Sequence, residues 1–168
     1  MVRDGLGNYV ERRVHKLESL SGLTDPLGRL FQYWRNLRVS TDCTFSNIDI
    51  VQLMRAEIVG KLHVVNVGNS DPEEFRFELF GYAVPLDRCE TVRALPVTIY
   101  AESTMQDYNA VRLAAAPRLD RVRSCIDGVN YHYTRLILPF VDRSHRVDRL
   151  LVGIRQEPGD GIKVQSTH

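Results

Sequence analysis

Histidine and cysteine are the side chains that most often bind metals or act as nucleophiles, and in this chain they stand apart from one another. The histidines are His15, His63, His132, His145 and His168. No two of them have the close spacing that builds a metal site from neighbouring residues, so only a metal held by distant residues stays open. The cysteines Cys43, Cys89 and Cys125 form no CxxC pair. They are typical of free thiols in a reducing cytoplasm.

Catalytic motifs are missing from the sequence. It contains no GxGxxG, GxxxxGK[ST], GxSxG or HExxH, which removes the usual signals for phosphate-binding loops, nucleophile elbows and zinc hydrolases. The acidic residues Asp71, Glu73, Glu74 and Glu78 flank a turn, where carboxylates normally face solvent. We therefore predict no catalytic residue and no metal site, and we assign no cofactor.

Arginine and tyrosine alternate with apolar residues along the last third of the chain. Residues 111–155 carry nine basic and four acidic side chains, a net charge of +5 in a chain whose total is +1. Alternation predicts one sheet face made of Arg121, Arg123, Tyr131, Tyr133, Arg135, Arg149 and Arg155. The opposite face would hold Val122, Leu136, Leu138, Leu150, Val152 and Ile154. Such a basic face could stack single-stranded nucleic acid, or be covered by the acidic residues Glu11 and Glu18. We favour the second interpretation.

Two helices are expected to precede the sheet. In residues 9–20 a narrow apolar stripe of Val10, Val14 and Leu17 predicts an amphipathic helix that needs a partner. Asp25 and Pro26 then form a capped start for a second helix that docks through Trp34. Because the first stripe is too short to hold a helix alone, we predict that it packs against a second copy in a homodimer.

The remaining elements group by type. Spacing predicts a short helix in 46–59, strands at 61–67 and 75–79, and a helix at 104–116. Three strands follow at 119–126, 131–141 and 147–156, the first two joined by the hairpin signal Asp127-Gly128. His63 is expected to be a half-exposed residue of the first strand. Grouped strands with inserted helices predict an α+β fold with an antiparallel sheet.

Length and composition fit one globular domain. The chain has 168 residues, of which 43% are hydrophobic and 26% charged. No apolar run approaches the ~20 residues needed to cross a bilayer, and no secretion signal opens the sequence. We expect a cytoplasmic protein with no membrane partner.

Several motifs resemble a known family. They are the run from Leu30 to Arg38 around Trp34, Asn47-Ile48-Asp49-Ile50, the segment 75–81, the segment 135–140, and the segment 147–153. Together they resemble the short, single-domain PAS-like proteins of alphaproteobacteria, over about residues 27–156. The resemblance implies a five-stranded antiparallel sheet of order 2-1-5-4-3 with helices on one face. With the helix expected at 9–20, we divide the chain into a helical extension at 1–24, the PAS-like domain at 25–156 and a flexible tail at 157–168.

The family members share no common cofactor, and their inferred role is sensing or signalling. We therefore expect a non-catalytic sensory or protein-interaction module that binds a signalling protein and no specific nucleic acid. It would be tuned by a small apolar ligand. The implied pocket is lined by Phe77, Leu79, Tyr82, Tyr100, Tyr108, Leu136, Leu138 and Val152. The expected partner-binding residues are Val10, Val14, Leu17, Arg121 and Arg149. The alternatives are a small enzyme of hot-dog or cone-shaped barrel type, and a nucleic-acid-binding sheet.

Overall fold

The fold is α+β, built on one antiparallel sheet. The computed structural model describes residues 1–20, 24–40, 42–49, 52–53, 61–81 and 88–157. Its strands are β1 (Val2–Arg3), β2 (Tyr9–His15), β3 (Leu62–Asn66), β4 (Arg76–Leu79), β5 (Arg118–Ile126), β6 (Val129–Val141) and β7 (Val147–Gln156). They lie in the order β1-β2-β5-β6-β7-β3-β4. The long helices of the described part are α1 (Pro26–Ser40) and α3 (Thr98–Ala114). The sheet thus has two strands more than the five expected from the resemblance.

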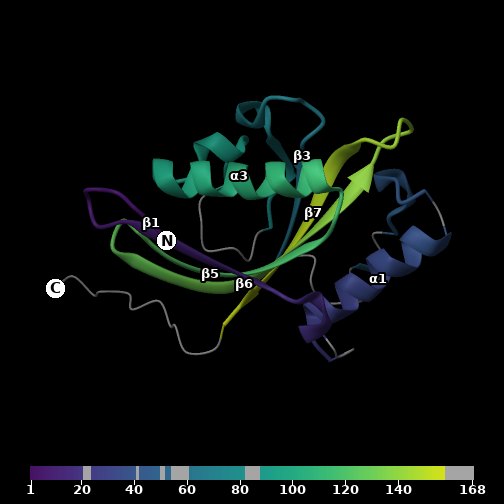
Figure 1. Cartoon of the computed structure of the whole chain (residues 1–168), viewed down its shortest axis with the longest axis horizontal. Coiled ribbons are helices and arrows are strands. Elements are labelled where there is room, and N and C mark those ends of the chain that lie inside the picture. Colours follow the sequence, from purple (N-terminus) through teal and green to yellow (C-terminus); the bar gives the residue numbers. More distant parts are fainter. Residues whose placement is uncertain (21–23, 41, 50–51, 54–60, 82–87, 158–168) are drawn as a thin grey trace.

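The two helices lie on opposite sides of the sheet, α3 above and α1 below in Figure 1. Beneath α3 the core contains Val65, Val122, Ile137, Leu150 and Val152. Beneath α1 it contains Leu62, Val64, Leu119, Leu136, Leu138 and Leu151. The expectation of helices on one face alone was therefore wrong. Because strand side chains alternate between faces, central strands buried on both sides read as nearly continuous apolar runs.

The hairpin between β5 and β6 decides which residues share a face. Asp127 and Gly128 have φ angles of +50° and +79°, as the predicted two-residue turn requires. This turn pairs Val122 with Tyr133. Tyr133 and Arg135 consequently lie on the α3 side with Val122, whereas Leu136 lies on the α1 side. The predicted faces were therefore wrong for β6, because even positions of β5 pair with odd positions of β6.

Helix α1 matches its sequence signals. The Asp25 carboxylate accepts a hydrogen bond from the Leu27 amide at 3.0 Å, as expected of a capping residue. Trp34 is buried, and its indole N–H donates to the Pro139 carbonyl at 2.9 Å. Gly153 of β7 lets the helix approach, since a Cβ there would lie 2.6 Å from Leu30 Cδ2. The predicted docking of this helix through Trp34 is confirmed.

The N-terminal segment is a strand, and the predicted helix at 9–20 was wrong. Residues Tyr9–His15 pair with β5 along their whole length, so the segment extends the sheet and is no separate helical extension. Val10 is buried, Val14 is 67% exposed, and Leu17 packs at the edge of the α1-side core. The three residues do not form one surface. The homodimer remains a prediction, but this stripe provides no interface for it.

The remaining expectations are met in part where the structure describes the chain. β3 and β4 form the predicted antiparallel pair, and α3 begins earlier than the predicted residue 104. His63 is 4% exposed, so its predicted half-exposure was wrong, because its ring packs against the rings of Phe77 and Phe80. Most of the predicted helix at 46–59 and the tail from 158 onward lie outside the described residues. Within the described part, no helix is long and apolar enough to cross a bilayer.

Candidate functional site

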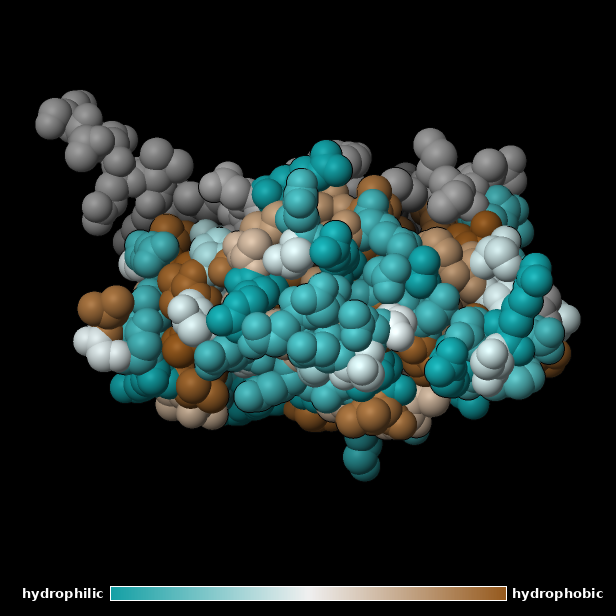
Figure 2. Space-filling model, turned by 90° about the horizontal axis from the view of Figure 1, so that it is seen from above, coloured by the Kyte–Doolittle hydropathy of each residue, from teal (hydrophilic) through white to brown (hydrophobic). Residues whose placement is uncertain are grey.

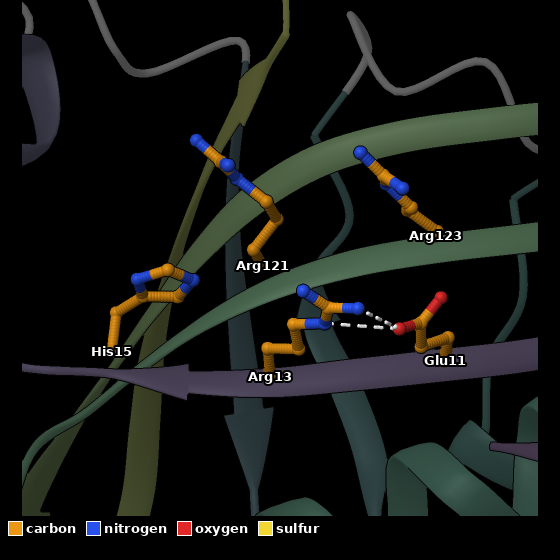
Figure 3. Close-up of a pocket in the computed structure, with 5 residues that line it drawn as sticks. All are labelled: Glu11, Arg13, His15, Arg121 and Arg123. Carbon is orange, nitrogen blue, oxygen red and sulfur yellow. Dashed lines mark hydrogen bonds and ion pairs between the residues drawn. The ribbon is translucent and has the colours of Figure 1, made fainter.

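Arginine side chains line β2 and β5 on the α1 side of the sheet, beyond the part that α1 covers. The register places Arg13 directly opposite Arg121, and Glu11 directly opposite Arg123. These four residues and His15 surround a hollow of about 60 Å³ (Figure 3). We call the surface formed by Glu11, Arg13, His15, Arg121 and Arg123 the arginine face. It lies on the α1 side of the sheet, but α1 packs on β6 and β7 and leaves β2 and the adjoining part of β5 uncovered.

The charges of the arginine face are only partly neutralised. Arg13 donates to Glu11 through Nε at 3.0 Å and lies 2.9 Å from it through Nη2. Arg121 lies 3.7 Å from a carboxylate oxygen of Glu157. Among the described residues, Arg123 has no ion-pair partner. Like charges directly opposite each other destabilise a sheet. The facing pair of Arg13 and Arg121 therefore lowers the stability of the sheet, and no packing contact in the described part of the chain accounts for its presence.

A second hollow continues the arginine face toward β6 and β7. It has a volume of about 90 Å³ and is bordered by Leu119, Thr134 and Arg155. Glu157 crosses this region: its amide donates to the His132 carbonyl at 3.1 Å, and its carboxylate accepts from the Thr134 hydroxyl. Arg155 pairs with Asp25, the capping residue of α1. Arg121, Thr134 and Arg155 thus hold the carboxylate of Glu157, so this part of the sheet binds a carboxylate.

The predicted basic face is divided by the structure. Arg121, Arg123 and Arg155 lie on the α1 side, whereas Tyr131, Tyr133 and Arg135 lie on the α3 side. Arg149 points to the same side as Arg155 but is six residues away along β7, about 20 Å. It donates to Glu78 at 2.7 Å. Arg121 and Arg149 therefore do not form the single partner surface that was predicted.

The predicted apolar pocket is not assembled either. Tyr100, Tyr108 and Val152 are buried in the core beneath α3, with Phe77 at its edge, whereas Leu136 and Leu138 are buried on the opposite side of the sheet. Leu79 is 42% exposed, and Tyr82 lies outside the described residues. Residues on opposite faces of one sheet cannot line a common pocket, so this set was wrong as a ligand site.

A buried ion network beneath α3 escaped sequence reasoning. Arg135 of β6 donates to Asp107 of α3 at 2.5 Å and to Asp120 of β5 at 2.9 Å. Arg118 pairs with both carboxylates at 3.0 and 2.8 Å, and Arg12 of β2 reaches Asp107 at 2.6 Å. Both carboxylates are fully engaged by guanidinium groups. The network therefore joins α3 to three strands and leaves no free acid or base.

Burial shapes the ionisation of this layer. It raises the pKa of Asp107, but the charge of Arg135 and a hydrogen bond from Arg12 outweigh that effect and hold the pKa below its usual value. Burial raises the pKa of Tyr100 and of Tyr133, whose hydroxyl groups are 2.8 Å apart. Burial and then the charge of Arg135 lower the pKa of His63 to about 4, and its Nδ1 accepts from the Gly81 amide at 3.1 Å. At neutral pH, Asp107 therefore stays charged, and Tyr100, Tyr133 and His63 stay neutral.

The side of the molecule above α3 offers little for docking. Figure 2 shows hydrophilic side chains over most of this side and hydrophobic ones only in small separate patches. No group of three or more metal-ligating residues occurs among the described residues. Arg13 and His15 were missed as site residues because their segment was read as a helix. The alternation of Glu11, Arg13 and His15 with Val10, Arg12 and Val14 was the available signal.

The chain matches no protein-family model, no curated protein and no solved structure.

Proposed function

We propose that the chain is a non-catalytic signalling module of PAS type that works by binding an acidic segment of another protein on the arginine face. The observation that carries the proposal is the cluster of Arg13, Arg121 and Arg123 around an open hollow on a part of the sheet that α1 does not cover. Arginine suits this role because its planar guanidinium group binds carboxylates in two-point contacts and is readily desolvated.

Strand order supports the PAS part of the proposal. Without the N-terminal pair β1 and β2, the sheet reads β4-β3-β7-β6-β5, which is 2-1-5-4-3 when these five strands are numbered along the chain. Helix α3 connects to the third of these strands and covers one face. The added strand β2 contributes half of the arginine face, so the partner site is a feature of this chain beyond the family plan.

The distribution of aromatic residues favours a protein partner over nucleic acid. Single-stranded nucleic acids are bound by bases stacked on exposed aromatic rings beside basic residues. Tyr131 and Tyr133 were the expected stacking residues, but they lie on the α3 side, and Tyr133 is buried there. A binding role without catalysis is supported by Asp107 and Asp120, whose carboxylates are occupied by arginines.

The test compares two variants of equal net charge. The probe is a fluorescein-labelled peptide of alternating glutamate and threonine residues, titrated by fluorescence anisotropy at physiological ionic strength. We expect Arg121→Gln plus Arg123→Gln to weaken its binding at least about tenfold, the effect of losing one charge-assisted hydrogen bond. The control Arg76→Gln plus Arg146→Gln removes two exposed arginines from elsewhere and should leave binding unchanged.

Nucleic acid provides the opposing outcome. A labelled single-stranded RNA should show no saturable binding under the same conditions, since screening removes non-specific attraction to a chain with net charge +1. Submicromolar RNA binding that disappears in the Arg121→Gln plus Arg123→Gln variant would overturn the proposal. Equal peptide binding by both double variants would also overturn it.

A further inference from the structure

From the arginine face we infer a more specific ligand, an inference that rests on the proposed function. We propose that the hollow between Arg13, Arg121 and Arg123 takes the phosphoryl group of a phosphorylated side chain on the partner protein. The bound segment would lie across β2 and β5, and the phosphoryl group would enter the hollow.

Charge is the first argument for a phosphoryl group. The hollow is lined by three arginines and one glutamate, which leaves a formal charge of +2 with His15 neutral. A phosphorylated side chain carries about −1.5 to −2 at neutral pH, whereas a single carboxylate carries −1. A phosphoryl group therefore matches the formal charge of these lining residues more closely than one carboxylate does, while Glu157, 3.7 Å from Arg121, offsets part of that charge at the edge of the hollow.

Donor geometry is the second argument. Glu11 occupies only Nε and Nη2 of Arg13, so the other N–H groups of that guanidinium remain available. Arg123 has no ion-pair partner among the described residues, and in Figure 3 Arg121 and Arg123 stand on the strand beside the one that carries Arg13. The three terminal oxygens of a phosphoryl group can bridge several guanidinium groups, whereas the two of a carboxylate usually serve one.

Size is the third argument. The hollow has about 60 Å³ of space, and about 10–15 Å³ by the same measure holds one water molecule. By that measure it holds about four to six water-sized groups, which is enough room for a phosphoryl group with its bridging oxygen. The neighbouring position already holds the smaller carboxylate of Glu157 against Arg121.

The experiment uses two forms of the acidic test peptide that differ only at a central threonine, which is phosphorylated in one. We expect phosphorylation to tighten binding to the full chain at least about tenfold, and Arg123→Gln to abolish that gain. Arg123→Lys should recover only part of it, since lysine keeps the charge but lacks the planar two-point contact. Arg76→Gln is the matched control and should keep the full gain.

The outcomes separate the two proposals. If both peptide forms bind equally and both depend on Arg121 and Arg123, the phosphoryl inference is wrong while the proposed function stands. If neither form binds, both are wrong. Inorganic phosphate should bind at least about tenfold more weakly than the phosphorylated peptide, because it lacks the flanking contacts; equal affinity would overturn a peptide ligand. The substituted arginines are exposed, and an unchanged urea midpoint would verify that each variant is folded.

Discussion

Replacing Asp107 by asparagine tests the ion network that joins α3 to the sheet. The substitution keeps the shape of the side chain and removes one negative charge from a cluster of three arginines and two aspartates. Asp107 is 3% exposed and bonds Arg12, Arg118 and Arg135. Removing one partner from a buried ion pair costs about 3–5 kcal/mol, because the other charge stays buried and uncompensated.

The structure sets the expected value near the lower end of that range. Arg12 and Arg118 are 20% and 22% exposed, so water can replace part of the interaction that they lose with the Asp107 carboxylate. Arg135 is 3% exposed, but it keeps Asp120 at 2.9 Å. We therefore expect Asp107→Asn to lower the free energy of unfolding by about 3 kcal/mol. Urea unfolding followed by the fluorescence of the single tryptophan, Trp34, measures it.

An exposed ion pair provides the control for this experiment. Glu73 and Arg93 are 53% and 57% exposed, and breaking such a surface pair costs about 0–1 kcal/mol. Glu73→Gln should therefore cause only a small loss. If Asp107→Asn destabilises the protein by no more than Glu73→Gln does, the network is not the buried connection between α3 and the sheet that its geometry indicates.

Two further predictions concern the core. The pKa of His63 is about 4 in the folded chain, below the ordinary 6.5, so the unfolded chain takes up a proton first and stability falls as pH drops from about 6.5 through 4. The loss of stability should reach about 3 kcal/mol, and it is measured by urea midpoints at several pH values. It should be largely absent in His63→Asn. If the exposed His15→Asn removed the pH dependence equally, the prediction would be contradicted. Gly153→Ala should cost about 1–3 kcal/mol in the same assay, because its Cβ would lie 2.6 Å from Leu30 Cδ2, while Gly5→Ala, with nothing within 4 Å, should cost almost nothing; equal losses would refute the close packing of α1.

Much of the fold could be predicted because its periodicities are unambiguous. The Asp127-Gly128 turn, the apolar spacing around Trp34 and the alternation of the last strands each have one physical reading. The segment of β2 does not. Val10 and Val14 are four residues apart, which places them on one face of a helix and equally on one face of a strand. Only pairing with β5, a long-range contact, decides between the two.

The candidate site depended on the same undecided features. Arg121 and Arg123 were predicted on a sheet face, but Arg13 and His15 join them only because β2 is a strand. The position of Tyr133 depended on the register of the hairpin, since a shift of one residue exchanges the two faces. Arg135 and Asp107 were unpredictable as a buried pair, because charged residues are normally exposed and their partnership spans distant parts of the chain.

The central claim, that the arginine face is the binding surface, is tested most directly by NMR of arginine side chains. The Nε–H signals of the full chain are recorded while the acidic test peptide is added at physiological ionic strength. We predict that the signals of Arg13, Arg121 and Arg123 shift in a saturable way, while that of Arg149, which is bound to Glu78 on another part of the sheet, stays unchanged. Saturable shifts confined to Arg149 or to other arginines, with the arginine face unmoved, would contradict the account.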